Sequence, residues 1–452
     1  MSIKSGVNPH FNYIKKMLHI QDSKIIITNI EDKIIKGINT LLVHISREID
    51  PTSCPYCNST YYISHNSYVR TLKFPDISGY NTLLKYKQKR YKCKECNKTF
   101  NEPCNLANSS STIANSLKLK IIEECKYKQS FKDISKSLNI SEPMVSKIFI
   151  DHVSISRHRL TETLCFDEFR ATTDAGKYAF IIGDPVSGEI IDIIKSRTKD
   201  FLQNYFNSVP FEEREKVKYI VTDLFEPYRS IIHLYFPNAL HIADRFHWIR
   251  QATEAFNKLR IRIMKNYQNL GEDIFKGKYN KYSTYYYQLK KYWKLLNKNK
   301  YTTSDSFFNK TQYDYYTKKE LTINDLIERL VNSDRDLEEG YTLLQSIYEI
   351  AKHANSANII EKLEDWIIKV RSSEYSVNEF KSVVDCFINW MDEIANSFII
   401  NPKTKTRMTN GFIEGKNNIC KTIKRIGFGY SNFDTFRSRV LYITNKNIPI
   451  KN

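Results

Sequence analysis

The sequence lacks the features that would place this protein in a membrane or hold it together with disulfides. No apolar run approaches the roughly 18 residues that a membrane-spanning helix needs, and no signal peptide is visible at the N-terminus. Nine cysteines are an odd number, and disulfide frameworks are rare in the cytoplasm, where we expect this chain to reside. No internal repeat and no low-complexity tail are visible. These absences favour a cytoplasmic globular protein.

Positive charge is what the chain has in excess, and it is unevenly distributed. The net charge is +19 over 452 residues, and this length allows about two to four domains. Residues 251–300 hold 12 Lys/Arg against 3 acids, 401–452 hold 11 against 2, and 321–400 hold 7 against 15. An AT-rich genome would raise the lysine count without causing this segregation. The pattern predicts binding to a polyanion, and nucleic acid is the expected partner.

Four of the cysteines form two pairs, Cys54-Pro-Tyr-Cys57 and Cys93-Lys-Glu-Cys96. Each pair puts two thiolates at a tight turn, which is half of a tetrahedral zinc site. The β-type sequence between the pairs suits a zinc ribbon with an inserted hairpin. Because four cysteine ligands leave no open coordination position, the pattern predicts a structural Zn²⁺ ion. The other five cysteines have no such neighbours and are expected in the core.

Residues 113–153 predict three helices, and the last two have the pattern of a helix-turn-helix. Residues 131–138 are amphipathic, residues 139–141 make a turn, and Ser141 is a good N-cap for the helix that begins at Glu142. A short helix, a tight turn and a second helix match the motif that reads DNA. An ordinary helical hairpin is the alternative. The residues expected to face DNA are Ser141, Glu142, Ser146 and Lys147.

From residue 161 to about 247, strands alternate with helices in an α/β pattern. The expected elements are strands 163–169, 177–182 and 189–194, a helix at 200–207 and a strand at 219–222. This order is that of a ribonuclease H-like fold, in which the first and fourth strands are neighbours. Asp167 on the first strand and Asp223 at the tip of the fourth would then converge. A carboxylate at such a tip carries a desolvation cost and commonly has a metal ion or a cation as its partner.

A third acid is expected from the segment Thr409-Asn-Gly-Phe-Ile-Glu414. Three carboxylates suffice for a pair of Mg²⁺ (or Mn²⁺) ions that act on phosphodiesters. If this segment is helical, Glu414 shares a face with residues of phosphate-binding types, which are Asn410, Asn417 or Asn418, Lys421 and Arg425. The opposite, apolar face would hold Phe412, Ile419, Ile423 and Ile426. An exposed glutamate on a basic helix is the alternative reading.

Asp244 competes with Glu414 for the third position. It ends a fifth strand in the segment Ala239-Leu-His-Ile-Ala-Asp244-Arg-Phe-His247, although Arg245 beside it could form an ion pair with it. Glu168 and Glu226 lie next to the proposed acids and could exchange roles with them. The identity of the third ligand is therefore open at this point.

Taken in order, these motifs resemble the bacterial insertion-sequence transposases of the ISL-three family. The resemblance rests on the cysteine pairs, the helix-turn-helix, the two aspartates, Ala243-Asp-Arg-Phe-His247, Thr409-Asn-Gly-Phe-Ile-Glu414 and the tail Lys424-Arg-Ile-Gly-Phe-Gly-Tyr-Ser-Asn-Phe433. It covers nearly the whole chain. It implies a DDE transposase with a helical insertion between the second aspartate and the glutamate.

The resemblance also implies a mechanism and its partners. Asp167, Asp223 and Glu414 would hold two Mg²⁺ ions, water would cut the transposon end, and the freed 3′-hydroxyl would attack target DNA. The N-terminal domains would bind the terminal inverted repeats of the element. Lys421, Lys424 and Arg425 would hold backbone phosphates. Transposases of this kind usually act as multimers on DNA, so a homo-oligomer is expected.

The expected fold is multidomain, with an N-terminal zinc ribbon and an all-α helix-turn-helix, then an α/β ribonuclease H-like catalytic domain interrupted by an all-α insertion. The expected boundaries are 1–106 for the zinc-ribbon region, 113–155 for the helix-turn-helix, 160–248 for the first part of the catalytic core, 249–400 for the insertion and 401–452 for the C-terminal helix and tail of the core.

Two other functions remain open. The first is a non-catalytic DNA-binding regulator that keeps the zinc ribbon and helix-turn-helix, but the presence of all three acids argues against it. The second is a ribonuclease H-like structure-specific endonuclease, such as a Holliday-junction resolvase. Such a nuclease would need no end-specific binding domain, whereas this chain has two candidates.

Overall fold

The computed structural model of the chain divides into two compact units. Residues 1–156 and 422–452 form the first, and residues 157–421 form the second. The structure describes residues 9–48, 50–153, 155–268, 283–430, 432–446 and 448–449. Every predicted domain except 160–248 therefore includes residues outside these ranges. No helix in the described part of the chain is long and apolar enough to cross a membrane.

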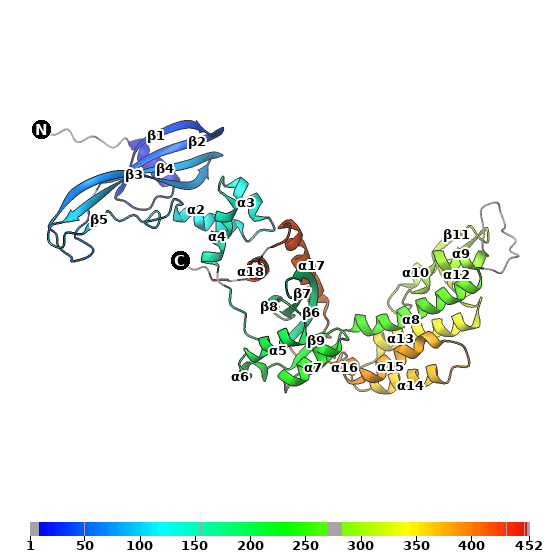
Figure 1. The fold of residues 1–452 in the computed structure, drawn as a ribbon. Coiled ribbons are helices and arrows are strands. Elements are labelled where there is room, and N and C mark those ends of the chain that lie inside the picture. The colour runs from blue at the N-terminus through cyan, green and yellow to red at the C-terminus, as the bar shows by residue number, and fades with distance from the viewer. Residues whose placement is uncertain are drawn as a thin grey trace. The chain divides into compact units, whose positions relative to one another are not determined.

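A five-stranded sheet forms the N-terminal part of the first unit (Figure 1). Its elements are α1 (Pro9–Met17), β1 (Ile25–Ile35), β2 (Ile38–Arg47), β3 (Tyr62–Ile77), β4 (Tyr80–Cys93) and β5 (Thr99–Asn101). The strand order is β1-β2-β4-β3, with β5 paired to β4, and only the β2–β4 pairing is parallel. The hairpin of β3 and β4 lies between the two cysteine pairs, as the sequence predicted.

Four helices complete the first unit. They are α2 (Asn115–Glu124), α3 (Phe131–Ser137), α4 (Glu142–His152) and α18 (Phe433–Thr444). The three helices predicted for residues 113–153 are confirmed. Ser141 is the N-cap residue of α4, but its side chain makes no capping hydrogen bond, whereas Ser130 and Asp133 form a full capping box at the start of α3.

A second five-stranded sheet lies at the centre of the second unit. Its elements are β6 (Thr163–Thr173), β7 (Gly176–Asp184), β8 (Glu189–Ile194), α5 (Lys199–Asn207), α6 (Phe211–Arg214), β9 (Tyr219–Thr222), α7 (Glu226–Tyr235) and β10 (Leu240–Ala243). The strand order is β10-β9-β6-β7-β8. The meander of β6 to β8 is antiparallel, whereas β6, β9 and β10 run parallel. The predicted pairing of the first strand with the fourth is confirmed.

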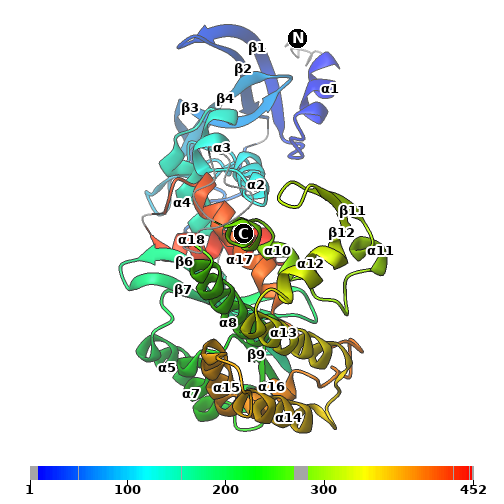
Figure 2. The same ribbon diagram turned by 90° about the vertical axis from the view of Figure 1, so that its right-hand side faces the viewer.

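A largely helical segment follows β10. Its helices are α8 (Arg245–Asn266), α9 (Thr284–Lys291), α10 (Trp293–Leu296), α11 (Asp305–Phe308), α12 (Ile323–Val331), α13 (Arg335–His353), α14 (Ile359–Arg371), the 3₁₀ helix η1 (Asn378–Phe380), α15 (Lys381–Asn389) and α16 (Met391–Asn396). Helices α8, α13, α14 and α15 lie side by side around one apolar core (Figures 1 and 2).

The insertion is not all-α, contrary to the prediction. It contains a hairpin of β11 (Thr311–Asp314) and β12 (Lys319–Thr322), with Lys318 in the left-handed conformation at the turn. Asp314, at the end of β11, is fully buried and accepts hydrogen bonds from Gln288 and Tyr292. These contacts with a neighbouring helix hold a short hairpin that would be unstable alone.

The predicted C-terminal domain 401–452 is divided between the two units. Its helix α17 (Gly411–Ile426) begins in the second unit, and the boundary between the units falls after Lys421. The last part of the chain, including α18, belongs to the compact unit that contains the helix-turn-helix. This grouping depends on contacts between residues far apart in the sequence, so local sequence patterns gave no indication of it.

Candidate active site

Acidic side chains gather where the parallel strands of the second unit end. Cys165 on β6 lies opposite Val221 on β9, and residues two apart along a strand share a face, so Asp167 and Asp223 lie at the same level. The last residues of β9 and β10 are also paired, and Asp223 and Asp244 are the residues that follow them. Three adjacent strands therefore each bring one carboxylate to the same edge of the sheet.

Helix α17 packs closely on this sheet because β7 has a glycine at the contact. A Cβ atom placed on Gly183 would lie 2.6 Å from the Ile413 side chain and 2.7 Å from the Phe412 ring. Both distances are far below a normal van der Waals contact, so a side chain at position 183 would displace the helix. Glu414 lies in the first turn of α17, directly after these two residues.

The buried face of α17 differs from the predicted apolar face. Its buried residues are Ile413, Asn417, Cys420 and Ile423, whereas Phe412, Ile419 and Ile426 are only partly buried. Helix α17 is thus rotated about its own axis by about one residue relative to the orientation that the sequence predicted. Its orientation is set partly by polar contacts of the two asparagines, which a hydrophobic pattern cannot represent.

Asn410 and Asn417 were predicted to contact DNA, but both side chains are buried, Asn417 within α17 and Asn410 just before it. The Asn410 amide donates to the carbonyl of Phe166 at 3.1 Å and to Asp223 Oδ1 at 3.4 Å. The Asn417 amide donates to Asp167 Oδ2 at 2.7 Å. The Oδ1 atoms of both asparagines are buried and have no hydrogen-bond partner within the described ranges. The two asparagines therefore orient the two aspartates, and their side chains do not face solvent.

The two aspartates are unfavourable as anions in this environment. Burial, together with the charge of Asp223, raises the pKa of Asp167 from 3.8 to about 7. Burial likewise raises the pKa of Asp223 from 3.8 to about 7, with an added contribution from Asp244. Desolvation and repulsion between like charges both favour the protonated form. A bound divalent cation would remove the repulsion, so this group of donors fits a metal such as Mg²⁺.

Glu414 and its rival Asp244 lie in the same cluster. Ligand atoms of Asp244, His247 and Glu414 are all within 4.8 Å of one another. Asp244 is 3% exposed and accepts a hydrogen bond from the Asn410 backbone amide at 3.0 Å, whereas Glu414 is exposed. His247 Nε2 also lies 3.1 Å from Asp223 Oδ1. The site therefore contains both candidates for the third ligand.

Sequence reasoning did not assign a role to His247. It lies three residues after Asp244 in the first turn of α8, and side chains at this spacing share a helix face. The spacing of Asp244 and His247 at a strand-to-helix junction could therefore have indicated that His247 belongs to the candidate site. Arg245, which could have paired with Asp244, donates its hydrogen bond to the carbonyl of Ala351.

The two neighbouring glutamates have other partners. Glu168 accepts hydrogen bonds from Arg197 and Tyr228. Glu226 is 60% exposed and pairs with Arg229 on the first turns of α7. Both carboxylates are therefore engaged with other side chains, although the charge of Glu168 also raises the pKa values of Asp167 and Asp223.

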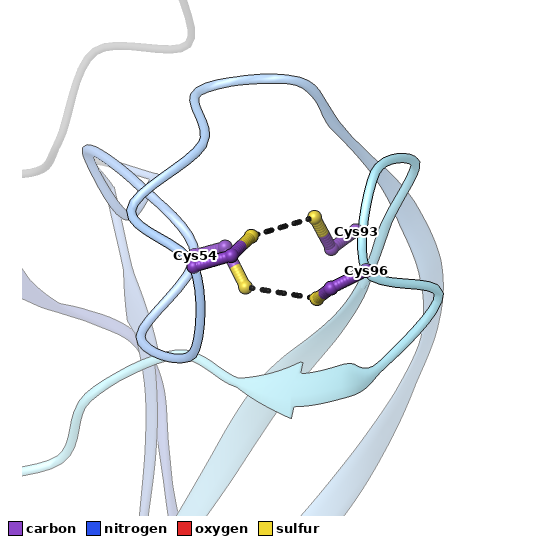
Figure 3. A group of neighbouring side chains, drawn as sticks. Cys54, Cys93 and Cys96 are labelled. Carbon is purple, nitrogen blue, oxygen red and sulfur yellow. Dashed lines mark hydrogen bonds between the residues drawn. The ribbon is translucent and has the colours of Figure 1, made fainter.

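The four paired cysteines form a second site, at the end of the β3–β4 hairpin (Figure 3). The sulphurs of Cys54 and Cys96 are 3.7 Å apart, and those of Cys57 and Cys93 are 3.5 Å apart. Four sulphurs at about 2.3 Å from a tetrahedral zinc ion are separated by about 3.8 Å. The spacing of the thiols therefore fits a structural Zn²⁺ ion.

The local backbone around the cysteines is built for metal binding. Asn58 and Asn97 each follow a C-x-x-C pair in the left-handed conformation, which closes both turns in the same way. Backbone amides of Cys96 and Glu95 donate to the Cys93 sulphur and lower its pKa to about 7, which favours the thiolate that zinc binds. Phe100 packs against the buried cysteines.

The DNA-facing residues predicted on α4 lie at its N-terminal end. Ser141, Glu142 and Lys147 are exposed and Ser146 is partly exposed. On α17, Lys421 and Arg425 are exposed and Lys424 is partly buried. The residues predicted to contact DNA are therefore at least partly accessible to solvent, except for Asn410 and Asn417.

Helix α18 completes the core of the helix-turn-helix. Arg439 is fully buried and donates from Nη2 to the carbonyls of Tyr127 at 3.2 Å and Gln129 at 2.8 Å. Its guanidinium lies 5.2 Å from the centre of the Phe131 ring. Tyr442 packs edge-on against Phe149 of α4, with ring centres 5.7 Å apart. The core of the helix-turn-helix therefore includes a helix that lies about 280 residues later in the sequence.

Comparisons with known proteins agree with these observations. The family model of the ISL3-type DDE transposases, described as "Transposase", matches residues 164–440. A second family model, "zinc-finger of transposase IS204/IS1001/IS1096/IS1165", matches residues 50–96.

The chain is also similar to the "Transposase for insertion sequence element IS1001" of Bordetella parapertussis. The two are 21% identical over 240 residues, which are 49% of this chain, and the match spans only about half (55%) of that relative. The family model, in contrast, covers more than half of the present chain and includes all the clustered acids. The protein belongs to the ISL3 family of transposases.

Proposed function

We propose that the protein is a DNA transposase that binds the terminal inverted repeats of its insertion sequence and cuts and joins DNA at a two-metal DDE site. The observation that carries this proposal is the convergence of carboxylates from β6, β9, β10 and α17 on a basic chain. The strand order, with β6 between β7 and β9, supports a ribonuclease H-like core. The helical insertion then separates Asp223 from Glu414 in the sequence.

Asp167, Asp223 and Glu414 would hold the divalent ions, with Asp244 as the alternative to Glu414. Two bound Mg²⁺ ions would activate the attacking oxygen and stabilise the leaving one during phosphodiester cleavage and strand transfer. Asn410 and Asn417 keep the aspartate carboxylates in place by donating hydrogen bonds to them. Their unpaired Oδ1 atoms are further oxygen acceptors at the site.

The basic residues supply binding without sequence preference. Lys421, Lys424 and Arg425 would contact backbone phosphates of the DNA. The exposed residues at the start of α4 would contact bases in the major groove, as the second helix of this motif commonly does. Assembly of two or more copies on paired DNA ends is part of the same proposal.

The test is a DNA cleavage and strand-transfer assay with the ends of the element and Mg²⁺ or Mn²⁺. We expect Asp223→Asn to bind the ends as the wild type does and to lose cleavage. Glu226→Gln is the matched control, because Glu226 lies three residues away and is exposed. Cleavage by Asp223→Asn at the wild-type rate would refute the DDE assignment.

The same assay separates the alternatives. Wild-type binding without any cleavage would indicate a regulator, and cleavage of branched DNA without preference for ends would indicate a structure-specific nuclease. Separate Asp244→Asn and Glu414→Gln variants distinguish the two candidates for the third ligand, since only the true ligand should abolish cleavage with binding retained.

A further inference from the structure

The loop after α17 holds a bulky aromatic residue in a conformation that disfavours it. Phe428 has φ +51°, in the left-handed region where a side chain of this size is rarely found. Its amide donates to the carbonyl of Arg425 and the amide of Gly429 to that of Lys424, both at 3.1 Å. This hydrogen-bond pair is a Schellman cap, and Phe428 occupies the position at which glycine is usual.

Packing within the fold does not account for this choice of residue. The Phe428 side chain is 93% exposed, so it contributes almost nothing to the core. The residues on either side of Phe428 are glycines, as the local backbone geometry requires. Gly429 has φ +92°, and a Cβ on Gly427 would lie 2.6 Å from the Tyr430 ring. A strained and exposed aromatic side chain between two such glycines indicates a contact with another molecule.

The position of Phe428 points to DNA as that molecule. It lines a pocket of about 510 Å³ together with Glu142 and Ser146 of α4 and Lys132 of α3. Glu142 and Ser146 are in the part of α4 that this motif presents to the major groove. All of these residues belong to the first unit, in which Tyr430 packs against Phe131 at a ring-centre distance of 6.4 Å.

Charge around the loop is complementary to a nucleic-acid backbone. Lys424 and Arg425 directly precede it, and Lys132 lines the pocket beside it. An apolar side chain with cations nearby in the chain is one arrangement by which DNA-binding proteins insert a wedge between base pairs while holding the phosphates. Lysine, of which two lie here, is depleted on surfaces that bind other proteins.

We propose that Phe428 is a wedge that enters the base stack of the double-stranded DNA bound by α4. The inference rests on the proposed function, because it assumes that α4 binds DNA. Phe428 then unstacks a base step beside the bases that α4 contacts, and the strained cap keeps the ring projecting from the surface. The helix-turn-helix and the loop after α17 together form one DNA interface, although they are far apart in the sequence.

The test uses full-length protein and DNA duplexes that the wild type enriches from a random pool. We expect Phe428→Ala and Phe428→Gly to bind these duplexes at least about 10-fold more weakly, since loss of one aromatic–base contact commonly has this effect. Permanganate-reactive thymines, which mark unstacked bases, should appear with the wild type and disappear with both variants. Phe428→Trp should restore binding and reactivity.

Two measurements separate a lost DNA contact from a folding defect. Phe428→Gly should raise the melting temperature by about 2–5 °C because it relieves the left-handed strain, while DNA binding falls. The slope of log affinity against log salt should stay unchanged in Phe428 variants and decrease by about 1 in Arg425→Gln, because only arginine neutralises a phosphate. Tyr315→Ala is the control, since Tyr315 is 72% exposed in the insertion.

The outcomes are distinguishable. If the wild type enriches no DNA, the proposed function fails and the wedge fails with it. If the wild type enriches DNA but Phe428→Ala binds it equally well, only the wedge is refuted. Equal DNA binding with an altered oligomeric state would also refute the wedge, because Phe428 would then contact another protein chain.

Discussion

Asp223→Asn should make the metal-free protein more stable at alkaline pH. The reason is the environment of the carboxyl group, which burial and the charge of Asp244 bring to a pKa of about 7 in the folded protein, against 3.8 ordinarily. A group whose pKa is higher in the folded state contributes stability below about pH 4 and loses this contribution as the pH rises through 7. At pH 8 the wild type therefore carries a destabilising anion that the amide lacks.

The size of the effect follows from the shift in pKa. A pKa that is about 3 higher in the folded protein corresponds to about 4 kcal/mol of lost folding free energy at pH 8. The amide loses the contact of the carboxylate with His247, which costs about 1 kcal/mol. A net gain of about 3 kcal/mol remains, and it should shrink to about zero near pH 4. For a domain of this size it corresponds to a rise in melting temperature of about 6 °C or more.

Differential scanning calorimetry at pH 4, 6 and 8, with and without Mg²⁺, is the assay. With Mg²⁺ the wild type should gain stability by ligand binding and the variant should gain little. Glu226→Gln, at an exposed and paired glutamate, should behave as the wild type at each pH. A variant that is no more stable than the wild type at pH 8 without metal, or that gains equal stability from Mg²⁺, would refute the carboxylate cluster as described.

Four further substitutions test other parts of the structure. Cys93→Ser should release the bound zinc and expose the zinc ribbon to proteases, and an unchanged zinc content would contradict the four-cysteine site. Gly183→Val should lower the free energy of unfolding by about 1–3 kcal/mol and weaken Mg²⁺ binding, measured by denaturation and calorimetry, because α17 must move away from β7. Asn417→Ala should reduce cleavage while end binding stays at the wild-type level in a mobility-shift assay; equal loss of both would indicate misfolding. Arg439→Met should destabilise the first unit by about 2–4 kcal/mol in a denaturant titration and lower DNA binding with it, whereas a variant of wild-type stability would show that α18 is dispensable there.

The parts of the fold that follow local patterns could be predicted from the sequence. The strands around Asp167 and the one that ends before Asp223 are short apolar runs bounded by turns, and their pairing follows from the order of elements. The zinc site could also be predicted from the sequence, because two C-x-x-C turns in one chain have few other uses. The roles proposed for the acids stay predictions, although the structure brings Asp167, Asp223 and Asp244 to one edge of the sheet and Glu414 close to Asp244.

Other features depend on contacts that no local pattern encodes. The hydrophobic period of α17 suggested one buried face, but hydrogen bonds from Asn410 and Asn417 to the aspartates favour another. The hairpin that ends at Thr322 lies in a helical segment and is held by the buried Asp314. Arg439 lies in a basic segment of the sequence but is completely buried, because its guanidinium donates hydrogen bonds to carbonyls of residues far away in the chain.

The packing of α18 on the helix-turn-helix also has a consequence for synthesis of the protein. A ribosome completes α4 long before it reaches Phe433, and at 5–20 residues per second the delay is about 15–60 s. During this interval the carbonyls of Tyr127 and Gln129 lack the arginine that bonds them in the finished fold. The unit that contains the helix-turn-helix therefore matures only after α18 has been synthesised, and a chain terminated before Phe433 would leave that unit without this helix.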